Sequence, residues 1–121
     1  MDKLRKKGPH LNHVLKRFEG TAPFRRLREL LIDETKSEIT ACGMAGSSPA
    51  FLLSCLKGQK DRPIIALLSS SDEAVNLYDD LVFLLGEEEV AFYPSRMVSP
   101  FEFRSPAAEI TAQRLATLSR I

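Results

Sequence analysis

The chain has 121 residues, 44% of them hydrophobic and 27% charged, a composition that excludes intrinsically disordered and collagen-like chains. No apolar run reaches the roughly 20 residues that cross a bilayer, and the basic start leads into no signal-peptide core, so we expect a cytoplasmic location. The net charge of +1 hides an asymmetry, because residues 1–36 carry ten basic and five acidic side chains, whereas the others carry seven and eleven.

Two amphipathic helices are predicted in the basic part of the chain. Apolar residues recur at spacings of three and four over residues 11–18 and again over residues 24–31. Gly20 separates the two patterns, and Thr21 followed by Pro23 is typical of a helix start. We therefore expect residues 1–36 to form basic N-terminal helices ahead of the main domain.

The basic residues of these helices raise the question of nucleic acid. The candidates for such a contact lie in the second helix and are Arg25, Arg26 and Arg28. Few aromatic residues accompany them, so the pattern does not indicate a stacking platform for single strands. The alternative, a solvated helix face, stays open.

Three strands are predicted in the main domain, residues 37–121. They are residues 38–43, 62–70 and 90–94. The second is a continuous apolar run bounded by turn residues, which is typical of a strand that is covered on both faces of a parallel sheet. Because the outer strand of such a sheet normally has a neighbour, we expect the chain to be a piece of a larger protein.

A helix is predicted after each strand. The three helix starts are Ser48-Pro49, a capping box formed by Ser70 and Glu73, and Ser105-Pro106. The predicted fold class is therefore α/β, a small parallel three-strand sheet with flanking helices.

Residues 43–50, GMAGSSPA, lie where the first strand would turn into a helix. A glycine turn at that place is the usual cradle for a nucleotide phosphate, yet this one contains no lysine. No metal site is expected, because Cys42 and Cys55 lack a CxxC spacing and His10 and His13 lack a further ligand close in sequence.

The order of the segments resembles the first domain of the transcription-repair coupling factors, a module that is similar to part of the repair protein UvrB. The segments are the glycine turn, RPIIALLSSSDEAVNLYDDLVFLLG, VAFYP and SPFEFRSPAAEITAQRLATL. Within them the matching motifs are Asp72-Glu73-Ala74, Leu81 to Gly86, Pro100-Phe101-Glu102 with Ser105-Pro106, and Gln113-Arg114-Leu115. Each motif is short, and their order and spacing make the resemblance specific.

The resemblance implies a helicase-like fold with a degenerate phosphate loop, and a parent protein that is an ATP-dependent translocase on double-stranded DNA. Such proteins release stalled RNA polymerase and recruit UvrA for nucleotide excision repair. Their motor, which uses ATP and Mg²⁺, and their polymerase-binding domain lie in other parts of the protein, and UvrA binds mainly the adjacent domain. The implied role of this chain is a non-catalytic N-terminal module; the alternative is a helicase fragment that contacts duplex DNA through its basic helices.

The resemblance also aligns the glycine turn with the UvrB-type loop G-x-x-G-x-G-K-T. In that alignment Pro49 takes the place of the lysine that neutralises phosphate, and Ala50 takes the place of the threonine that holds Mg²⁺. We therefore expect no catalytic residue, cofactor or metal in this chain, only a vestigial loop of Gly43, Gly46, Ser47, Ser48, Pro49 and Ala50. The other candidates for contacts are Phe101, Glu102 and Arg104 in the irregular stretch before the last helix, with ordinary loop packing as the alternative.

Overall fold

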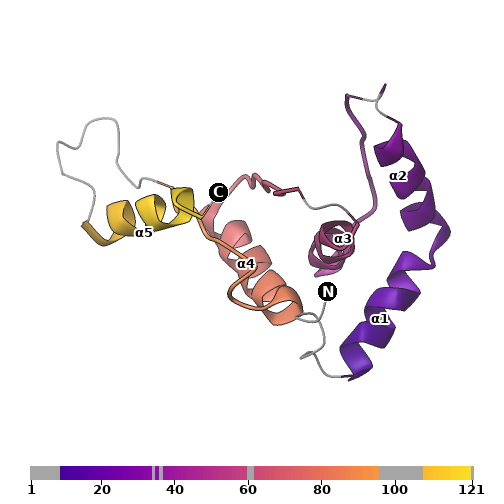
Figure 1. Ribbon diagram of the computed structural model, residues 1–121, viewed down its shortest axis with the longest axis horizontal. Helices are drawn as coiled ribbons and strands as arrows, with labels where there is room; N and C mark the ends of the chain where they lie inside the picture. Colours follow the sequence, from indigo (N-terminus) through magenta and orange to yellow (C-terminus); the bar gives the residue numbers. More distant parts are fainter. Residues whose placement is uncertain (1–8, 34, 36, 60–61, 96–107, 121) are drawn as a thin grey trace. The chain divides into compact units, whose positions relative to one another are not determined.

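The computed structural model describes residues 9–33, 35, 37–59, 62–95 and 108–120, and in this part the chain forms five α-helices (Figure 1). They are α1 (Pro9–Glu19), α2 (Ala22–Ile32), α3 (Ser48–Lys57), α4 (Ser71–Leu85) and α5 (Ala108–Leu118). Backbone contacts divide the chain into two compact units, Met1–Ile64 and Ile65–Ile121. The predicted domain boundary lies elsewhere, after residue 36, and the two predicted domains stay a prediction.

The first unit is built around aromatic residues from three helices. Phe18 at the end of α1 packs edge-on against Phe24 of α2, with ring centroids 5.8 Å apart, and its centroid lies 6.1 Å from that of Phe51 on α3. Phe24 and Ala50 are buried, with 2% and 0% of their surface exposed. The helices α1 and α2 follow one another along one side of α3 (Figure 1), as expected for short amphipathic helices that bury one apolar stripe.

The second unit contains α4 and α5 and the segment that joins them. The predicted capping box is confirmed, since the Ser70 hydroxyl accepts a hydrogen bond of 3.2 Å from the Glu73 amide. The helix α4 ends at Gly86, whose φ of 93° is a conformation that other residues rarely adopt. Leu84 is buried, and Tyr78 of α4 lies 5.4 Å from Phe92, measured between ring centroids.

The predicted three-strand sheet is wrong. The described residues contain no β-strand and no ladder, and the predicted strands 38–43, 62–70 and 90–94 are irregular. The helical predictions near residues 11–18, 24–31, 49–58 and 71–86 are confirmed, and so is the last helix as far as it is described. The architecture that the structure shows is therefore helical rather than α/β.

Two physical reasons account for the error. The run at 62–70 was expected to be covered on both faces, but its side chains are exposed, and Ile65 and Leu67 expose 77% and 92% of their surface. Hydrophobicity alone predicts burial and does not provide a neighbouring strand. The run at 90–94 does have a partner, but that partner is a helix, as the next subsection describes.

Candidate functional site

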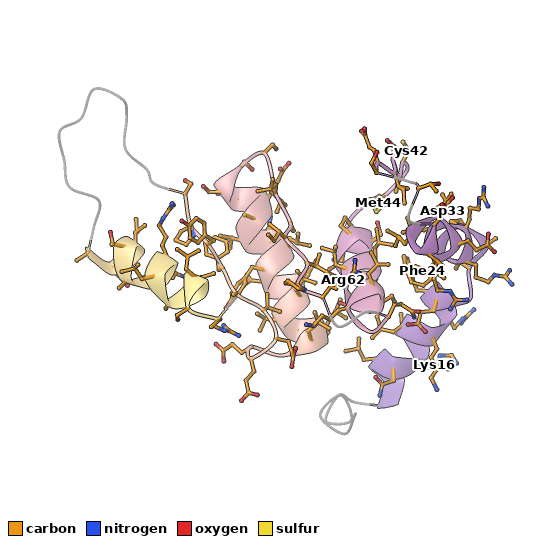
Figure 2. The ribbon with its side chains drawn as sticks, turned by 45° about the horizontal axis from the view of Figure 1, so that its top comes forward. Lys16, Phe24, Asp33, Cys42, Met44 and Arg62 are labelled. Carbon is orange, nitrogen blue, oxygen red and sulfur yellow. The ribbon has the colours of Figure 1, made fainter. Side chains whose placement is uncertain are left out.

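The glycine turn keeps the backbone shape that the sequence predicts. Gly43 and Gly46 have φ angles of 79° and 55°, in the left-handed region that favours glycine. The turn leads into α3, with Ser47 as its N-cap residue and Pro49 in the first turn. Ser48, which was predicted to be the N-cap, is instead the first residue of the helix. In Figure 2, Cys42 and Met44 lie on the segment that enters this turn.

The amides of the turn are engaged within the turn itself. The Ser48 amide donates to the Ala45 carbonyl at 3.2 Å, and the Ala45 amide donates to the Ser48 hydroxyl at 2.9 Å. The Ala50 and Phe51 amides both donate to the Ser47 carbonyl, at 3.0 and 3.2 Å. A phosphate at a helix N-terminus is held by amides that point at the ligand. In this turn, the amides of Ser48, Ala50 and Phe51 already have protein acceptors.

Pro49 and Ala50, which the resemblance aligns with lysine and threonine, are also closed to that chemistry. Pro49 has no charge and no amide hydrogen, and Ala50 is fully buried at 0% exposure. A phosphate contact made by an ammonium group is worth about 1.5–3 kcal/mol, and proline cannot replace it. Pro49 and Ala50 can begin and pack α3, and they offer neither a cation for phosphate nor a hydroxyl for a metal ion.

A second constellation, which we call the α5 clasp, joins α5 to the segment after α4. Two side chains of α5 and one just beyond it donate hydrogen bonds to backbone carbonyls: Arg114 to Pro94 at 2.7 Å, Thr117 to Phe92 at 2.7 Å, and Arg120 to Val90 at 3.2 Å and to Glu88. Arg114 and Thr117 are three residues apart and therefore lie on one face of α5. The acceptors are two residues apart, the spacing at which extended chain presents carbonyls on one edge.

The α5 clasp gives residues 90–94 a partner other than a strand. The carbonyl edge that a neighbouring strand would use is occupied by side chains of a helix. Arg114 also lies over the Tyr93 ring, with its guanidinium carbon 4.1 Å from the centroid, and a cation above an aromatic face adds about 0.5–2 kcal/mol. Thr117 is buried at 8% exposure, so its hydroxyl bond is shielded from water.

The sequence reasoning noted Arg114 only as part of a resemblance motif and missed Thr117 and Arg120. The signal that was available is the polar triplet at positions 114, 117 and 120, spaced three residues apart. A polar stripe at helical spacing does not by itself identify the carbonyls that it binds. The clasp therefore became visible only in three dimensions.

The two cysteines have different environments. Cys42 is exposed, whereas Cys55 is buried on α3 and its thiol donates weakly to the Leu15 carbonyl at 3.9 Å. Burial, and then the nearby Glu19 carboxylate, raise the pKa of the Cys55 thiol to about 11, so it is inert at neutral pH. Among the described residues, no group of three or more histidine, cysteine or acidic side chains could hold a metal ion.

The predicted interaction residues fall into two sets. Phe101, Glu102 and Arg104 lie outside the described residues. Arg25, Arg26 and Arg28 are exposed on α2, and Arg26 forms an ion pair of 3.3 Å with Glu29. The proposed contact roles of both sets of residues stay predictions.

No helix of the described part is long and apolar enough to cross a membrane.

Comparison with known proteins relates the chain to one class, the transcription-repair-coupling factors of bacteria. No protein-family model and no solved structure matches the chain. Two curated proteins do, and both carry that name.

The particular relatives come from two bacteria. The chain is 28% identical to the transcription-repair-coupling factor of Bacillus subtilis (strain 168) over 90 residues, and these residues are 74% of this chain. It is 31% identical over 68 residues, 56% of this chain, to that of Rickettsia bellii (strain RML369-C). The matched regions are 8% and 6% of the length of these relatives. These similarities confirm that the chain is related to transcription-repair-coupling factors, and the particular domain stays a prediction.

Proposed function

We propose that this chain is a non-catalytic N-terminal module of a transcription-repair coupling factor that works by docking. The parent would be an ATP-dependent translocase on double-stranded DNA, with ATP and Mg²⁺ bound in a motor outside this chain. It would release stalled RNA polymerase and recruit UvrA, mainly through the adjacent domain. The similarity to two such factors supports this proposal, and so does the short share of their length that the chain matches.

The observation that supports the absence of catalytic activity is the structure of the glycine turn. Ala50 is fully buried where a phosphate loop has its metal-binding hydroxyl, and Pro49 stands where such a loop has its lysine. The amides of Ser48, Ala50 and Phe51 donate inside the turn and the first turn of α3. The turn thus works as a helix cap that keeps only the outline of a nucleotide site.

Support for docking comes from the apolar surface of the second unit. Leu115 and Leu118 of α5 expose 62% and 54% of their surface, and Phe83 of α4 exposes 74%. Leu115 and Leu118 are three residues apart and share a face, which borders the clasp face because Leu118 is four residues after Arg114. Large apolar side chains gathered on one helix face are typical of a surface that a partner covers. The other domains of the parent are the proposed partner for this face.

Reconstitution in trans tests the docking proposal. The chain is mixed with the parent factor lacking the matching residues, and complex formation is followed by analytical size-exclusion chromatography. We expect a complex that the double substitution Leu115→Gln and Leu118→Gln weakens at least roughly tenfold, because two apolar side chains then lose burial worth about 1.5–3 kcal/mol each. The matched control is Glu109→Gln with Ala116→Gln, two exposed positions on another face of the same helix.

Two outcomes would refute the docking proposal. One is the absence of a complex with the unsubstituted chain. The other is equal weakening by the test pair and by the control pair, which would mean that the face of Leu115 and Leu118 has no special part in the contact.

A further inference from the structure

One side of α4 combines exposed carboxylates with an exposed aromatic ring. We call Asp72, Asn76, Asp79 and Phe83 the acidic face, and all four side chains are exposed. They follow one another at spacings of four, three and four residues, so they form one row along the helix. Phe83, at the end of the row, exposes 74% of its surface. The row therefore offers negative charge and an apolar anchor on one surface.

No cation in the described part of the second unit neutralises the acidic face. In residues 65–95 and 108–120 the basic side chains are Arg114 and Arg120. Both donate to backbone carbonyls in the α5 clasp, Arg114 to Pro94 and Arg120 to Val90. The carboxylates of the acidic face are therefore available to cations of another molecule.

The exposed side of α2 carries the complementary pattern. We call Arg25, Arg28 and Ile32 the basic face; all three are exposed, and Ile32 exposes 66% of its surface. They are three and four residues apart and form one row, which borders the buried side of the helix. The ion pair on α2 between Arg26 and Glu29 uses neither arginine of the row. The basic face thus offers positive charge and an apolar anchor.

The two faces match in spacing as well as in charge. Ile32 follows Arg28 by four residues, as Phe83 follows Asp79, and each step is about 6 Å along a helix axis. Two helices that lie side by side in the same direction therefore bring Arg28 to Asp79 and Ile32 to Phe83 in one register. In that register the other arginine of the basic face lies opposite the asparagine of the acidic face.

We propose that the acidic face of one copy binds the basic face of a second copy of this chain. Every copy carries both faces, so the complementary partner is present wherever the chain is. Opposite charges select the partner and the register, and the apolar residue at the end of each row adds burial. Two single helix faces bury less than the roughly 1,200 Å² of a stable complex, so the contact is weak and reversible.

This inference goes beyond the proposed docking role, which places other domains of the parent on Leu115 and Leu118. Arg25 and Arg28 are among the predicted contact residues, and an acidic helix face is here their ligand. The self-contact uses α2 and α4, whereas the docking role uses α5, so substitutions on these helices separate the two.

Sedimentation equilibrium of the 121-residue chain, loaded at about 10 µM to about 1 mM, tests the proposal. We expect the average mass to rise with concentration above the 13.5 kDa of one copy. The rise should be smaller in about 1 M than in about 0.1 M NaCl, because the screening length falls from about 10 Å to about 3 Å. Asp79→Arg and Arg28→Glu should each weaken the association roughly fivefold or more, since each brings like charges together.

A mixture of the two charge-reversed chains gives the sharpest result. Between a chain with Asp79→Arg and a chain with Arg28→Glu, opposite charges meet again in both contacts, so an equimolar mixture should associate nearly as well as the unsubstituted chain. The matched controls Glu109→Arg and Lys16→Glu change the net charge by the same amounts at exposed positions on α5 and α1. They should leave the association nearly unchanged, and circular dichroism confirms that each variant keeps its helices.

Three results would overturn the proposal. The first is an unsubstituted chain that keeps the mass of one copy up to about 1 mM. The second is charge reversals that match their controls, or a mixture of them that associates no better than either alone. The third is loss of association in Leu115→Gln with Leu118→Gln while the reversals have no effect, which would assign the self-contact to α5.

Discussion

Replacing Thr117 by valine isolates one hydrogen bond of the α5 clasp. The substitution keeps the shape of the side chain and removes the hydroxyl that donates to the Phe92 carbonyl at 2.7 Å. Thr117 is 8% exposed, so water cannot readily replace the lost donor. A net hydrogen bond is worth about 0.5–1.5 kcal/mol and an unsatisfied buried acceptor costs about 1–3 kcal/mol, so we expect Thr117→Val to destabilise the chain by about 1–2 kcal/mol.

Urea unfolding measures this loss, with Thr111→Val as the matched control. Thr111 is exposed on the same helix, so its substitution makes the same change in helix propensity without breaking the clasp. With an m value of about 1–3 kcal/mol/M, Thr117→Val should lower the midpoint by roughly 0.3–2 M, and Thr111→Val should change the stability by less than about 0.5 kcal/mol. Equal effects of the two substitutions would refute the view that the clasp holds α5.

Three further predictions concern stability. A double-mutant cycle of Arg114→Ala and Tyr93→Leu, measured by urea unfolding, should give a coupling of about 0.5–1 kcal/mol from the stacked guanidinium, and a coupling of zero would contradict the stacking. The pKa of Cys55 is raised from 9.0 to about 11 in the folded chain. The protonated thiol therefore contributes fully to the free energy of unfolding below pH 9, and this contribution, about 2–3 kcal/mol at most, is lost as the pH rises through 11. The substitution Cys55→Ala should remove this part of the pH dependence of stability. Gly86→Ala should lower the free energy of unfolding by about 1–3 kcal/mol because φ is 93° there, although the added methyl group meets no atom within 4 Å. Gly58→Ala, at φ −71°, should be neutral or stabilising. Equal urea midpoints for the two variants would refute the conformational reason.

The helices could be predicted because their signals are local. The spacing of apolar residues, the capping box at Ser70 and Glu73, and the glycine after α4 each act within a few residues of the chain. The glycine turn could be predicted for the same reason, whereas the replacement of a lysine and a threonine follows only from the resemblance and stays a prediction. Local sequence thus predicted every described helix.

The sheet could not be predicted correctly because strand formation depends on what lies beside a segment. The apolar run at 62–70 indicated a covered strand, whereas its side chains are exposed. The run at 90–94 has hydrogen bonds to side chains of α5, which lies about 20 residues further along the chain. The partners Arg114 and Thr117 carry no local signal of that role, so the α5 clasp required the structure.

The measurement that tests the central claim most directly is ATP turnover by the purified chain in the presence of Mg²⁺. The claim is that the glycine turn is a helix cap, because Pro49 and Ala50 offer neither the cation nor the metal ligand of a phosphate loop, and the amides of Ala45, Ser48, Ala50 and Phe51 donate within the turn and the start of α3. We expect no turnover above a protein-free blank, and none in the matched variant Gly46→Asp. Turnover that persists through further purification and disappears in Gly46→Asp would contradict the account.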